Sequence, residues 1–374
     1  MRIFFLVFAE SSALSSNIFC QYDIQGHRGG RGHTVENTLP SFAWGLINGV
    51  TTLELDNGIT KDGHVIVWHD EEFVPTKCKD TGPVTPEDPL YPYVGKFVAN
   101  LTLAQVKTLD CGSLRQPDYP RQILYPSTRV ATLPEFFSFL NCADPKAQIK
   151  LNIESKIDPV STNSTVGVSE FVERQHEVFR TAGAPWYNKY GAITLQSFDW
   201  RTLVGMKKKD QTDGHGNILL SALVDGVTAV TNSSWLADAE LSSFPGPTLG
   251  EQIAQAAYSI GAHILSPDCI AQTSTTTNPN AEGFVEFTTE AMVNEAHKLG
   301  MAVKPWTVDD LELLKRLVLD YKVDGIISDE PRDVRRWAKY EADLLVGRTY
   351  PKKRVFECLK EHVQVDSTSY LKNL

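Results

Sequence analysis

Short strand-like segments alternate with amphipathic, helix-like segments along most of the chain. Segments rich in β-branched and other apolar residues predict eight strands, at residues 22–27, 51–56, 148–154, 191–197, 218–224, 262–267, 301–306 and 324–329. Between them, apolar residues recur at helical spacing over residues 39–49, 132–140, 168–183, 249–261, 288–300 and 308–321. Several of these helical segments end in a glycine just before the next strand, as a left-handed helix C-cap requires.

The order of these elements predicts an α/β fold with a parallel sheet. Strands that alternate with helices are joined by right-handed crossovers, which make neighbouring strands parallel. Eight is the number of strands that closes a (β/α)8, TIM-type barrel. An open, doubly wound sheet shows the same alternation and stays open as an alternative.

One long segment interrupts the alternation. Residues 71–129 follow the second predicted strand and are rich in Pro, Tyr and Asp. Structureless loops of that length are uncommon in compact domains and are often lids or substrate-binding loops. We therefore expect one barrel domain over residues 17–348 with a small inserted subdomain at about 71–129, followed by a tail over 349–374. After Trp337 the pattern indicates one terminal helix and then a polar end.

Composition narrows the classes of partner. The 374 residues carry a formal net charge of −10, and the pI is near 5.4. This acidic balance argues against a nucleic-acid-binding protein, which needs a basic face. No stretch approaches the roughly 20 apolar residues of a membrane-spanning helix. We expect a small-molecule ligand, and an anionic ligand would need a local positive site within this acidic chain.

The N-terminus indicates export. The stretch "MRIFFLVFAESSALSSN" has a basic residue, a short apolar run and then small residues, which resembles a secretory signal. We predict that residues 1–16 are a signal peptide and that the mature protein is secreted. Three N-x-[ST] sequons, at Asn100, Asn163 and Asn232, are compatible with glycosylation.

Six cysteines are scattered along the chain without a CxxC pair, so a zinc ribbon is not expected. One or two disulfides fit a secreted protein, and Cys78 with Cys111 is the first pair that we predict. Free buried thiols are the alternative.

Charged residues follow several predicted strands, where a barrel carries its chemistry. Glu54 and Asp56 are two positions apart and share one face of a strand, with Leu53 and Leu55 on the other face. Two adjacent carboxylates repel, and one becomes protonated unless a cation neutralises them. With Glu154 they predict an oxygen site for one Ca²⁺ or Mg²⁺ rather than Zn²⁺. The alternative is a pair of surface acids.

A hairpin brings a histidine to the same place. The segment "NGITKDGHVIVWHD" turns at its KDG, and two runs joined by so short a turn pair antiparallel. A two-residue turn places His69 opposite Asp56, and a three-residue turn places it opposite Leu55. Either register returns His69 beside the carboxylates and toward His27. Two histidines that flank a cation suit general acid–base chemistry, because imidazole titrates near pH ~6.5.

The remaining histidines have no such placement and are expected to be ordinary polar surface residues: His33, His64 and His215. The glycine-rich stretch "GHRGGRGHTVENT" lacks the GK[ST] of a P-loop, the GxGxxG of a dinucleotide fold and the His-x-His of zinc-dependent barrel hydrolases. What remains is a strand-end His-Arg, glycines that allow a tight backbone turn, and a helix start at "ENT".

These motifs together resemble the glycerophosphodiester phosphodiesterase family. The match consists of "HRG" with "ENT" behind it, "ELDNGITKDG", "VWHD", "LNIESK", "LQSF", "WTVDD" and "DGIISDEP", in order over residues 26–331. One departure is Val35, where the family commonly has proline. The resemblance implies a TIM-type barrel of the phospholipase-C-like phosphodiesterase superfamily, with its small inserted subdomain at residues 71–129.

Residue by residue, the resemblance also implies a site. Three carboxylates would bind the divalent cation, two histidines would be the acid and base, and a further set would hold the phosphate and the organic group. These are, in that order, Glu54, Asp56 and Glu154; His27 and His69; and Arg28, Lys156 and Trp306. The implied reaction is hydrolysis of a glycerophosphodiester to glycerol 3-phosphate and an alcohol. In its two-step form a substrate hydroxyl attacks phosphorus to give a cyclic phosphate, which water then opens.

Two alternatives stay open. One is a phospholipase-type relative on the same barrel that acts on lysophospholipids or sphingolipids, for which the aromatic residues of the insertion leave room. The other is a non-catalytic phosphodiester-binding protein. Such a protein is expected to lack a histidine or a carboxylate of the site, and this sequence lacks none of them.

Overall fold

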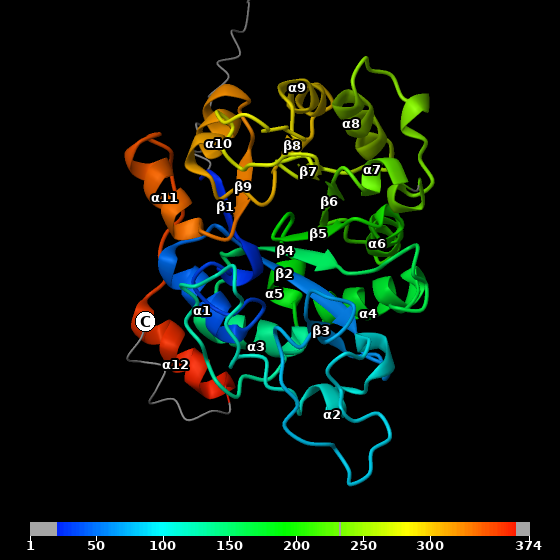
Figure 1. Ribbon diagram of the computed structural model, residues 1–374, viewed down its shortest axis with the longest axis vertical. Helices are drawn as coiled ribbons and strands as arrows, with labels where there is room; N and C mark the ends of the chain where they lie inside the picture. Colours follow the sequence, from blue (N-terminus) through cyan, green and yellow to red (C-terminus); the bar gives the residue numbers. More distant parts are fainter. Residues whose placement is uncertain (1–20, 232, 364–374) are drawn as a thin grey trace, which may run out of the picture.

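The computed structural model describes residues 21–231 and 233–363 (Figure 1). The predicted signal peptide at residues 1–16, the sequon at Asn232 and the end of the tail lie outside the described residues.

Eight parallel strands form a barrel, as predicted. They are β1 (Asp23–Gly26), β2 (Thr52–Ile59), β4 (Lys150–Ser155), β5 (Ile193–Ser197), β6 (Leu219–Val224), β7 (Ile264–Pro267), β8 (Ala302–Val303) and β9 (Gly325–Ser328). They pair in the order β8-β7-β6-β5-β4-β2-β1-β9. Main-chain hydrogen bonds then join the two ends of this order: Asp324 N to Val303 O at 2.9 Å, and Ile327 N to Pro305 O at 3.1 Å. The open-sheet alternative is therefore excluded.

The predicted hairpin is present, and its turn has three residues. Strand β3 (Val65–Val67) pairs antiparallel with the end of β2, with Asn57 opposite Val67 and Ile59 opposite Val65. The Thr60 N–H donates to the His64 carbonyl at 3.0 Å and closes the turn. This is the register that would place His69 opposite Leu55 if the pairing continued.

Helices surround the barrel (Figure 1). Those that connect successive strands are α1 (Leu39–Asn48), α3 (Leu133–Ala143), α4 (Val168–Arg180), α5 (Ala184–Tyr187), α6 (Trp200–Thr212), α7 (Thr228–Thr231), α8 (Leu249–Ser259), α9 (Glu290–Lys298) and α10 (Leu311–Lys315), which continues into a π-helical turn (Arg316–Asp320). After β9 follow α11 (Pro331–Tyr340) and α12 (Lys352–His362).

The ends of α1 show why this segment is helical where it is. The Thr38 side chain accepts the Ser41 N–H as N-cap, and Pro40 lies in the first turn, where no backbone donor is needed. Gly49 ends the helix with φ 79°, a left-handed conformation that glycine adopts without steric cost. The predicted glycine cap is therefore confirmed for this helix.

Residues on the strands alternate between an apolar outer face and a polar lumen. Leu53 and Leu55 point outward into the main hydrophobic core and are completely buried. Inside the barrel, Asn152 donates to Gln25 and Gln196, both at 2.8 Å. The polar side chains of the lumen are thus paired with one another, and the same inward face leads to the carboxyl ends of the strands.

The insertion is a subdomain with its own core. It contains two short helices, η2 (Val98–Asn100) and α2 (Leu103–Val106). Its buried cluster includes Phe73, Tyr93, Leu101 and Leu109 and is separate from the main core. The predicted Cys78–Cys111 disulfide lies in this cluster.

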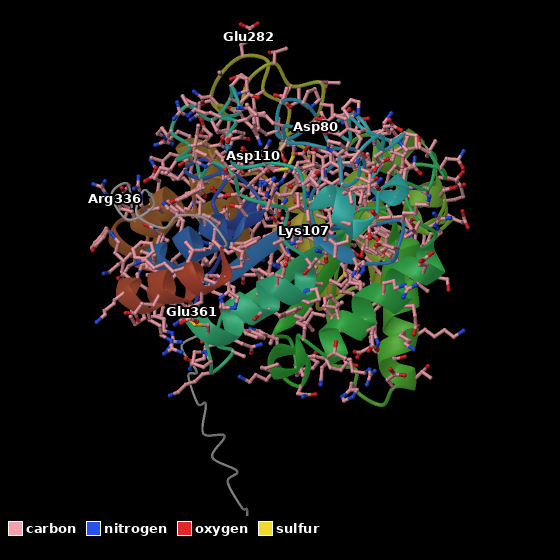
Figure 2. The ribbon with its side chains drawn as sticks, turned by 90° about the horizontal axis from the view of Figure 1, so that it is seen from below. Asp80, Lys107, Asp110, Glu282, Arg336 and Glu361 are labelled. Carbon is pink, nitrogen blue, oxygen red and sulfur yellow. A yellow bond between two sulfur atoms is a disulfide. The ribbon has the colours of Figure 1, made fainter. Side chains whose placement is uncertain are left out.

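The insertion lies over one end of the molecule. Figure 2 shows its residue Asp80 at the same end as Glu282 of the loop after β7, with Glu361 of α12 toward the other end. The carboxyl ends of the barrel strands are therefore covered by the insertion and by the loops that follow the strands.

The segment beyond residue 348 contributes the helix α12. Val355 and Leu359 are buried against the main core. A second disulfide, which the sequence did not specify, joins Cys358 of this helix to Cys142 of α3. The division into a barrel domain and a tail at this point stays a prediction. Among the described residues, no helix is long and apolar enough to cross a bilayer.

Candidate active site

Three carboxylates meet at the carboxyl end of the barrel. Glu54 and Asp56 come from β2 and Glu154 from β4, and Asp56 is the direct ladder partner of Glu154. One oxygen of each lies within 4.8 Å of the others. Glu54 is 1% exposed and Asp56 is fully buried, so the pair are not surface acids.

The carboxylates cannot all be ionised without compensation. Two unit charges about 5 Å apart repel by roughly 3 kcal/mol at an effective dielectric constant of about 20. Burial and the neighbouring carboxylates raise the pKa of Glu54 well above its ordinary value. Burial is also the main reason that the pKa of Glu154 rises to about 7. For Asp56 the neighbouring His69 and the positive charges of Arg28 and Lys156 outweigh burial, and its pKa is lowered.

The donor set of this cluster fits a hard divalent cation. Glu54 accepts hydrogen bonds from the Arg28 backbone N–H at 2.7 Å and the Gln196 amide at 2.8 Å. Asp56 Oδ2 accepts from Asn37 at 2.7 Å, whereas the buried Asp56 Oδ1 has no hydrogen-bond partner among the described residues. Oriented carboxylates with free oxygens are the ligands that Ca²⁺ and Mg²⁺ prefer.

The loop after β1 places Arg28 against the carboxylates. Arg28 adopts a left-handed conformation with φ 50°, which is uncommon for a residue with a side chain. This conformation directs its N–H at Glu54 while its guanidinium donates to Glu36 at 2.9 Å. Gly29 follows with φ 92°, and a Cβ there would lie 2.5 Å from the Ser41 hydroxyl oxygen. The glycine of the "HRG" sequence is therefore required by the packing of this turn on α1.

The "ENT" sequence supports the same loop. Glu36 forms ion pairs with Arg28, Arg31 and Lys77. Asn37 is left-handed as well, a conformation that asparagine tolerates, and it hydrogen-bonds Asp56. Thr38 then caps α1, so each residue of the motif has a distinct structural contact.

His27 is held by a carboxylate. Its Nδ1 lies 2.6 Å from Asp329 Oδ1, at the end of β9, and its Nε2 lies 3.3 Å from Arg28 Nε. Burial, followed by the charges of Arg28 and Arg31, lowers the pKa of His27 in spite of Asp329. The imidazole is therefore neutral near pH 7, with Nδ1 as the donor to Asp329 and Nε2 unprotonated as the acceptor of the Arg28 Nε–H.

His69 is held in the same manner. Its Nδ1 lies 2.7 Å from Asp70 Oδ1, and its Nε2 lies 3.1 Å from Lys156 Nζ. Burial, then the charges of Arg28 and Lys156, lower the pKa of His69 well below its ordinary value. Each of the two histidines thus has one nitrogen on a carboxylate and the other beside a cation.

The walls of the site combine cations and aromatic rings. Lys156 forms an ion pair with Glu154 at 2.9 Å, and its ammonium lies 5.7 Å from the centre of the Phe198 ring. Trp306 packs edge-to-face on Phe198 at 5.4 Å and donates its indole N–H to the Ser266 carbonyl. The resulting cavity has a volume of about 140 Å³ and is lined by His27, Arg28, Arg31, Glu54, His69, Glu154, Lys156, Gln196, Phe198, Leu223, Trp306, Thr307 and Ile327.

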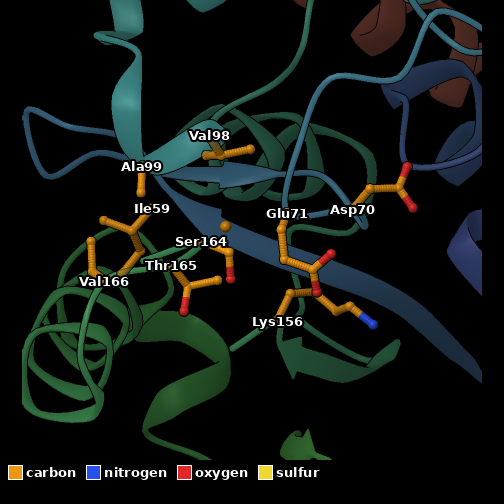
Figure 3. Close-up of a pocket in the computed structure, with 10 residues that line it drawn as sticks. Ile59, Asp70, Glu71, Val98, Ala99, Lys156, Ser164, Thr165 and Val166 are labelled. Carbon is orange, nitrogen blue, oxygen red and sulfur yellow. The ribbon is translucent and has the colours of Figure 1, made fainter. Parts of the chain in front are cut away.

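A second, smaller pocket lies behind Lys156. It has a volume of only about 10 Å³ and is lined by residues of β2, the insertion and the loop after β4, including Asp70, Glu71 and Ser164 (Figure 3). Lys156 lines both pockets, so its side chain forms part of the partition between them.

The structure brings all eight residues of the predicted site to one end of the barrel. Among the other histidines, the prediction for one is wrong. His64 and His215 are exposed, as expected. His33 is buried, stacks on Trp44 with ring centres 4.7 Å apart, and lies 3.1 Å from Glu330. A histidine in a glycine-rich loop was expected to face solvent, but this loop folds back onto α1.

Sequence reasoning missed the residues that hold the histidines. Asp329 ends the last strand, a position that the barrel rule for strand ends could have indicated. Asp70 directly follows His69 in the quoted "VWHD" motif. Lys77 and Tyr119 come from the insertion and contact Asp70 and Asp329, and no periodic pattern in the sequence marks them.

Comparison with known protein families and sequences gives one consistent result. The model of the glycerophosphoryl diester phosphodiesterase family matches residues 27–333. A glycerophosphodiester phosphodiesterase of Caldanaerobacter subterraneus is 24% identical over 305 residues, which are 82% of this chain and 93% of that protein. Human lysophospholipase D GDPD1 is 51% identical over 47 residues, which are 13% of this chain and 15% of that protein.

Solved structures show the same fold. A protein of Silicibacter pomeroyi assigned as a glycerophosphoryl diester phosphodiesterase has a TM-score of 0.64 and 25% identity, over 84% of this chain and 92% of that one. A phosphodiesterase of Oleispira antarctica, solved with the product sn-glycerol-3-phosphate, has a TM-score of 0.57 and 18% identity, over 85% of this chain and 97% of that one.

Proposed function

The chain belongs to the glycerophosphoryl diester phosphodiesterase family, and we propose that it hydrolyses glycerophosphodiesters to glycerol 3-phosphate and an alcohol with a divalent cation and two histidines. The observation that carries this proposal is the cluster of three buried carboxylates beside two carboxylate-held imidazoles in one cavity. Family membership alone supports hydrolysis of the diester, and the geometry supports the division of roles.

The histidines have the arrangement that proton transfer needs. His27 and His69 each keep Nε2 free of a carboxylate and both line the cavity. One, as the neutral imidazole, removes the proton from the attacking substrate hydroxyl, and the other, once it carries a proton on Nε2, gives that proton to the leaving alcohol oxygen. In the second step, when water opens the cyclic phosphate, the two exchange roles.

The phosphate of the substrate is held by positive groups. Arg28 and Lys156 supply these groups, and Arg28 lies beside His27 while Lys156 lies beside His69. Glu54, Asp56 and Glu154 would hold the divalent cation, which would supply further neutralisation of charge on the phosphoryl oxygens. Trp306 and Phe198 form an apolar wall for the organic part of the substrate.

A direct assay tests the reaction. Purified enzyme with added Ca²⁺ or Mg²⁺ should release glycerol 3-phosphate from glycerophosphocholine and glycerophosphoethanolamine, measured with a coupled glycerol-3-phosphate dehydrogenase. Release of phosphocholine or phosphoethanolamine instead would show that the ester bond between glycerol and phosphate is cut. Absence of cleavage of either diester would overturn the proposed function.

A second substrate class belongs in the same assay. Val230 of α7 and Val285 of the loop after β7 are 66% and 43% exposed, and both follow the carboxyl ends of strands. Apolar side chains at this end of the barrel suit an acyl chain, and one of the similar proteins is a lysophospholipase D. Lysophosphatidylcholine and sphingomyelin are therefore the comparison substrates. If either is cleaved faster than the glycerophosphodiesters, the preferred substrate is a lipid.

We also propose that the protein is secreted. Two disulfides support an oxidising compartment, and the sequon residues Asn100 and Asn163 are exposed. Protein from culture medium is expected to begin close to Asn17 and to carry a glycan at Asn100 or Asn163, as peptide mass spectrometry can measure. Unglycosylated protein that keeps Met1 and stays in the cytosol would contradict this.

A further inference from the structure

We propose that Tyr119 is a positioning residue for His27, which it orients through Asp329, so that the inserted subdomain is part of the acid–base machinery. The inference rests on the proposed role of His27 as a proton-transfer group. Tyr119 lies within the insertion and does not line the cavity with the histidine, so an effect of its hydroxyl on the reaction passes through the carboxylate that this hydroxyl contacts.

Asp329 is engaged from both sides. Its Oδ1 lies 2.6 Å from His27 Nδ1, and its Oδ2 accepts the Tyr119 hydroxyl at 2.7 Å. The carboxylate is almost fully buried, and its next cationic neighbour, Arg31, is 4.0 Å from Oδ2. Loss of the phenol would therefore leave one buried oxygen without a close donor and allow the carboxylate to rotate away from the imidazole.

Tyr119 is itself held in place by the loop that carries His27. Its ring lies under the Arg31 guanidinium at 4.5 Å. Its carbonyl accepts the Gln122 N–H, and the Gln122 amide donates to the Arg31 carbonyl at 2.9 Å. The Ile123 N–H donates to the His33 carbonyl. The contact between the insertion and Asp329 is thus one of several anchors between these two segments.

The protonation states fit this chain of contacts. Burial and the charge of Asp329 raise the pKa of Tyr119, so the phenol remains a donor. In spite of burial, the contact with His27, the charge of Arg31 and the Tyr119 hydrogen bond lower the pKa of Asp329, so the carboxylate accepts both bonds. This arrangement fixes the His27 tautomer with its proton on Nδ1 and leaves Nε2 unprotonated, where it accepts the Arg28 Nε–H at 3.3 Å and can take a proton from the substrate.

The second histidine has the same support. Asp70 holds His69 through one oxygen, and its other oxygen accepts Lys77 Nζ at 2.6 Å. Lys77 also belongs to the insertion and forms an ion pair with Glu36 at 2.8 Å. Both histidine–carboxylate pairs are therefore closed by a side chain of the inserted subdomain, which is the pattern expected if the insertion orders them.

Tyr119→Phe tests the proposal, because it removes only the hydroxyl and keeps the ring on Arg31. We expect kcat to fall about tenfold, as for loss of a hydrogen bond to a charged group, with KM and Ca²⁺ affinity unchanged. Tyr93→Phe is the matched control. Tyr93 is buried in the same subdomain, and its hydroxyl donates to Asp88 at 2.8 Å, away from the site. It should retain wild-type kcat.

A spectroscopic readout separates positioning from general damage. ¹⁵N-edited NMR of labelled imidazoles, assigned with His27→Gln, should show one Nδ1–H tautomer of His27 in the wild type and in Tyr93→Phe. Tyr119→Phe should show tautomer mixing at His27. The double variant with Asp329→Asn should be no slower than Asp329→Asn alone, because the phenol acts only through that carboxylate.

Each outcome decides the matter. Wild-type kcat and an unchanged His27 spectrum in Tyr119→Phe would overturn the inference, and so would an equal loss in Tyr93→Phe, which would indicate a weakened subdomain. Additive losses in the double variant would also overturn it. If the wild type cleaves no glycerophosphodiester, the proposed function fails, whereas the His27 spectra still test the link from Tyr119 to His27.

Discussion

His27→Ala and His69→Ala are each expected to lower kcat by about 10²–10⁴-fold, the usual contribution of a positioned proton-transfer group. Both side chains line the cavity with a nitrogen that no carboxylate occupies, whereas the three-carboxylate cluster contains neither of them. The affinity for Ca²⁺ should therefore stay nearly unchanged. Initial rates with glycerophosphocholine and isothermal titration of Ca²⁺ measure the two quantities on the same preparations.

The exposed His64 provides the matched control, since it lies on the turn before β3 and its side chain is about half exposed. His64→Ala should retain wild-type kcat. If either site variant loses Ca²⁺ as severely as a carboxylate variant does, that histidine is a ligand and the proposed role is wrong. A near-normal kcat for His69→Ala would show that the hairpin does not bring this ring to the reacting atoms.

Most of the fold could be predicted from the sequence, because each strand and most helices show a hydrophobic pattern typical of that element. Helix α6 was not predicted from the sequence. Its large buried apolar residues are only Trp200, Leu203 and Met206, and the second half of the helix is polar, so the apolar pattern is short. The alternation of strands and helices alone did not decide between a closed barrel and an open sheet. Closure depends on hydrogen bonds between the segments at Val303 and Asp324, which this alternation does not specify.

The site was predictable as far as it lies on strands. Glu54, Asp56 and Glu154 follow from their spacing and from the rule that parallel strands present their carboxyl ends together. The contact between Tyr119 and Asp329 joins residues 210 positions apart, and it arises from the packing of the insertion on the barrel. Such supports depend on tertiary structure and leave no periodic signal, although they decide which nitrogen of His27 carries the proton.

The chain is acidic as a whole, but its candidate active site contains several cationic side chains. The formal net charge is −10, yet Arg28, Arg31 and Lys156 all line the one cavity that contains the carboxylate cluster. Their charges are balanced in the structure by Glu36, Asp56 and Glu154. We expect a phosphodiester to replace some of these carboxylates as the partner of the cations.

Removal of divalent cations is expected to abolish turnover, and Ca²⁺ or Mg²⁺ should restore it. The cluster holds three buried carboxylates with one oxygen that has no donor, and without a cation at least one of them is protonated. Protons compete with the cation, because the pKa of Glu154 is about 7. Ca²⁺ affinity should therefore weaken below pH 7, by up to about tenfold per pH unit for each proton displaced. Chelation followed by titration at pH 6 and pH 8 measures both effects.

Glu54→Gln assigns the binding to this cluster. The substitution keeps the size of the side chain and its acceptor oxygen but removes the charge, so Ca²⁺ affinity should fall by at least about tenfold and kcat should recover only at high Ca²⁺. Asp268→Asn is the matched control. Asp268 also follows a barrel strand, and burial raises its pKa to about 6, yet it lies outside the cluster. If this control loses Ca²⁺ as Glu54→Gln does, or if chelated enzyme keeps full activity, the three carboxylates are not the cation site. If only Glu54→Gln loses Ca²⁺ affinity, the Glu54 carboxylate contributes to the cation site. Both variants replace a buried carboxylate by an amide, so the difference between them comes from the position of the residue.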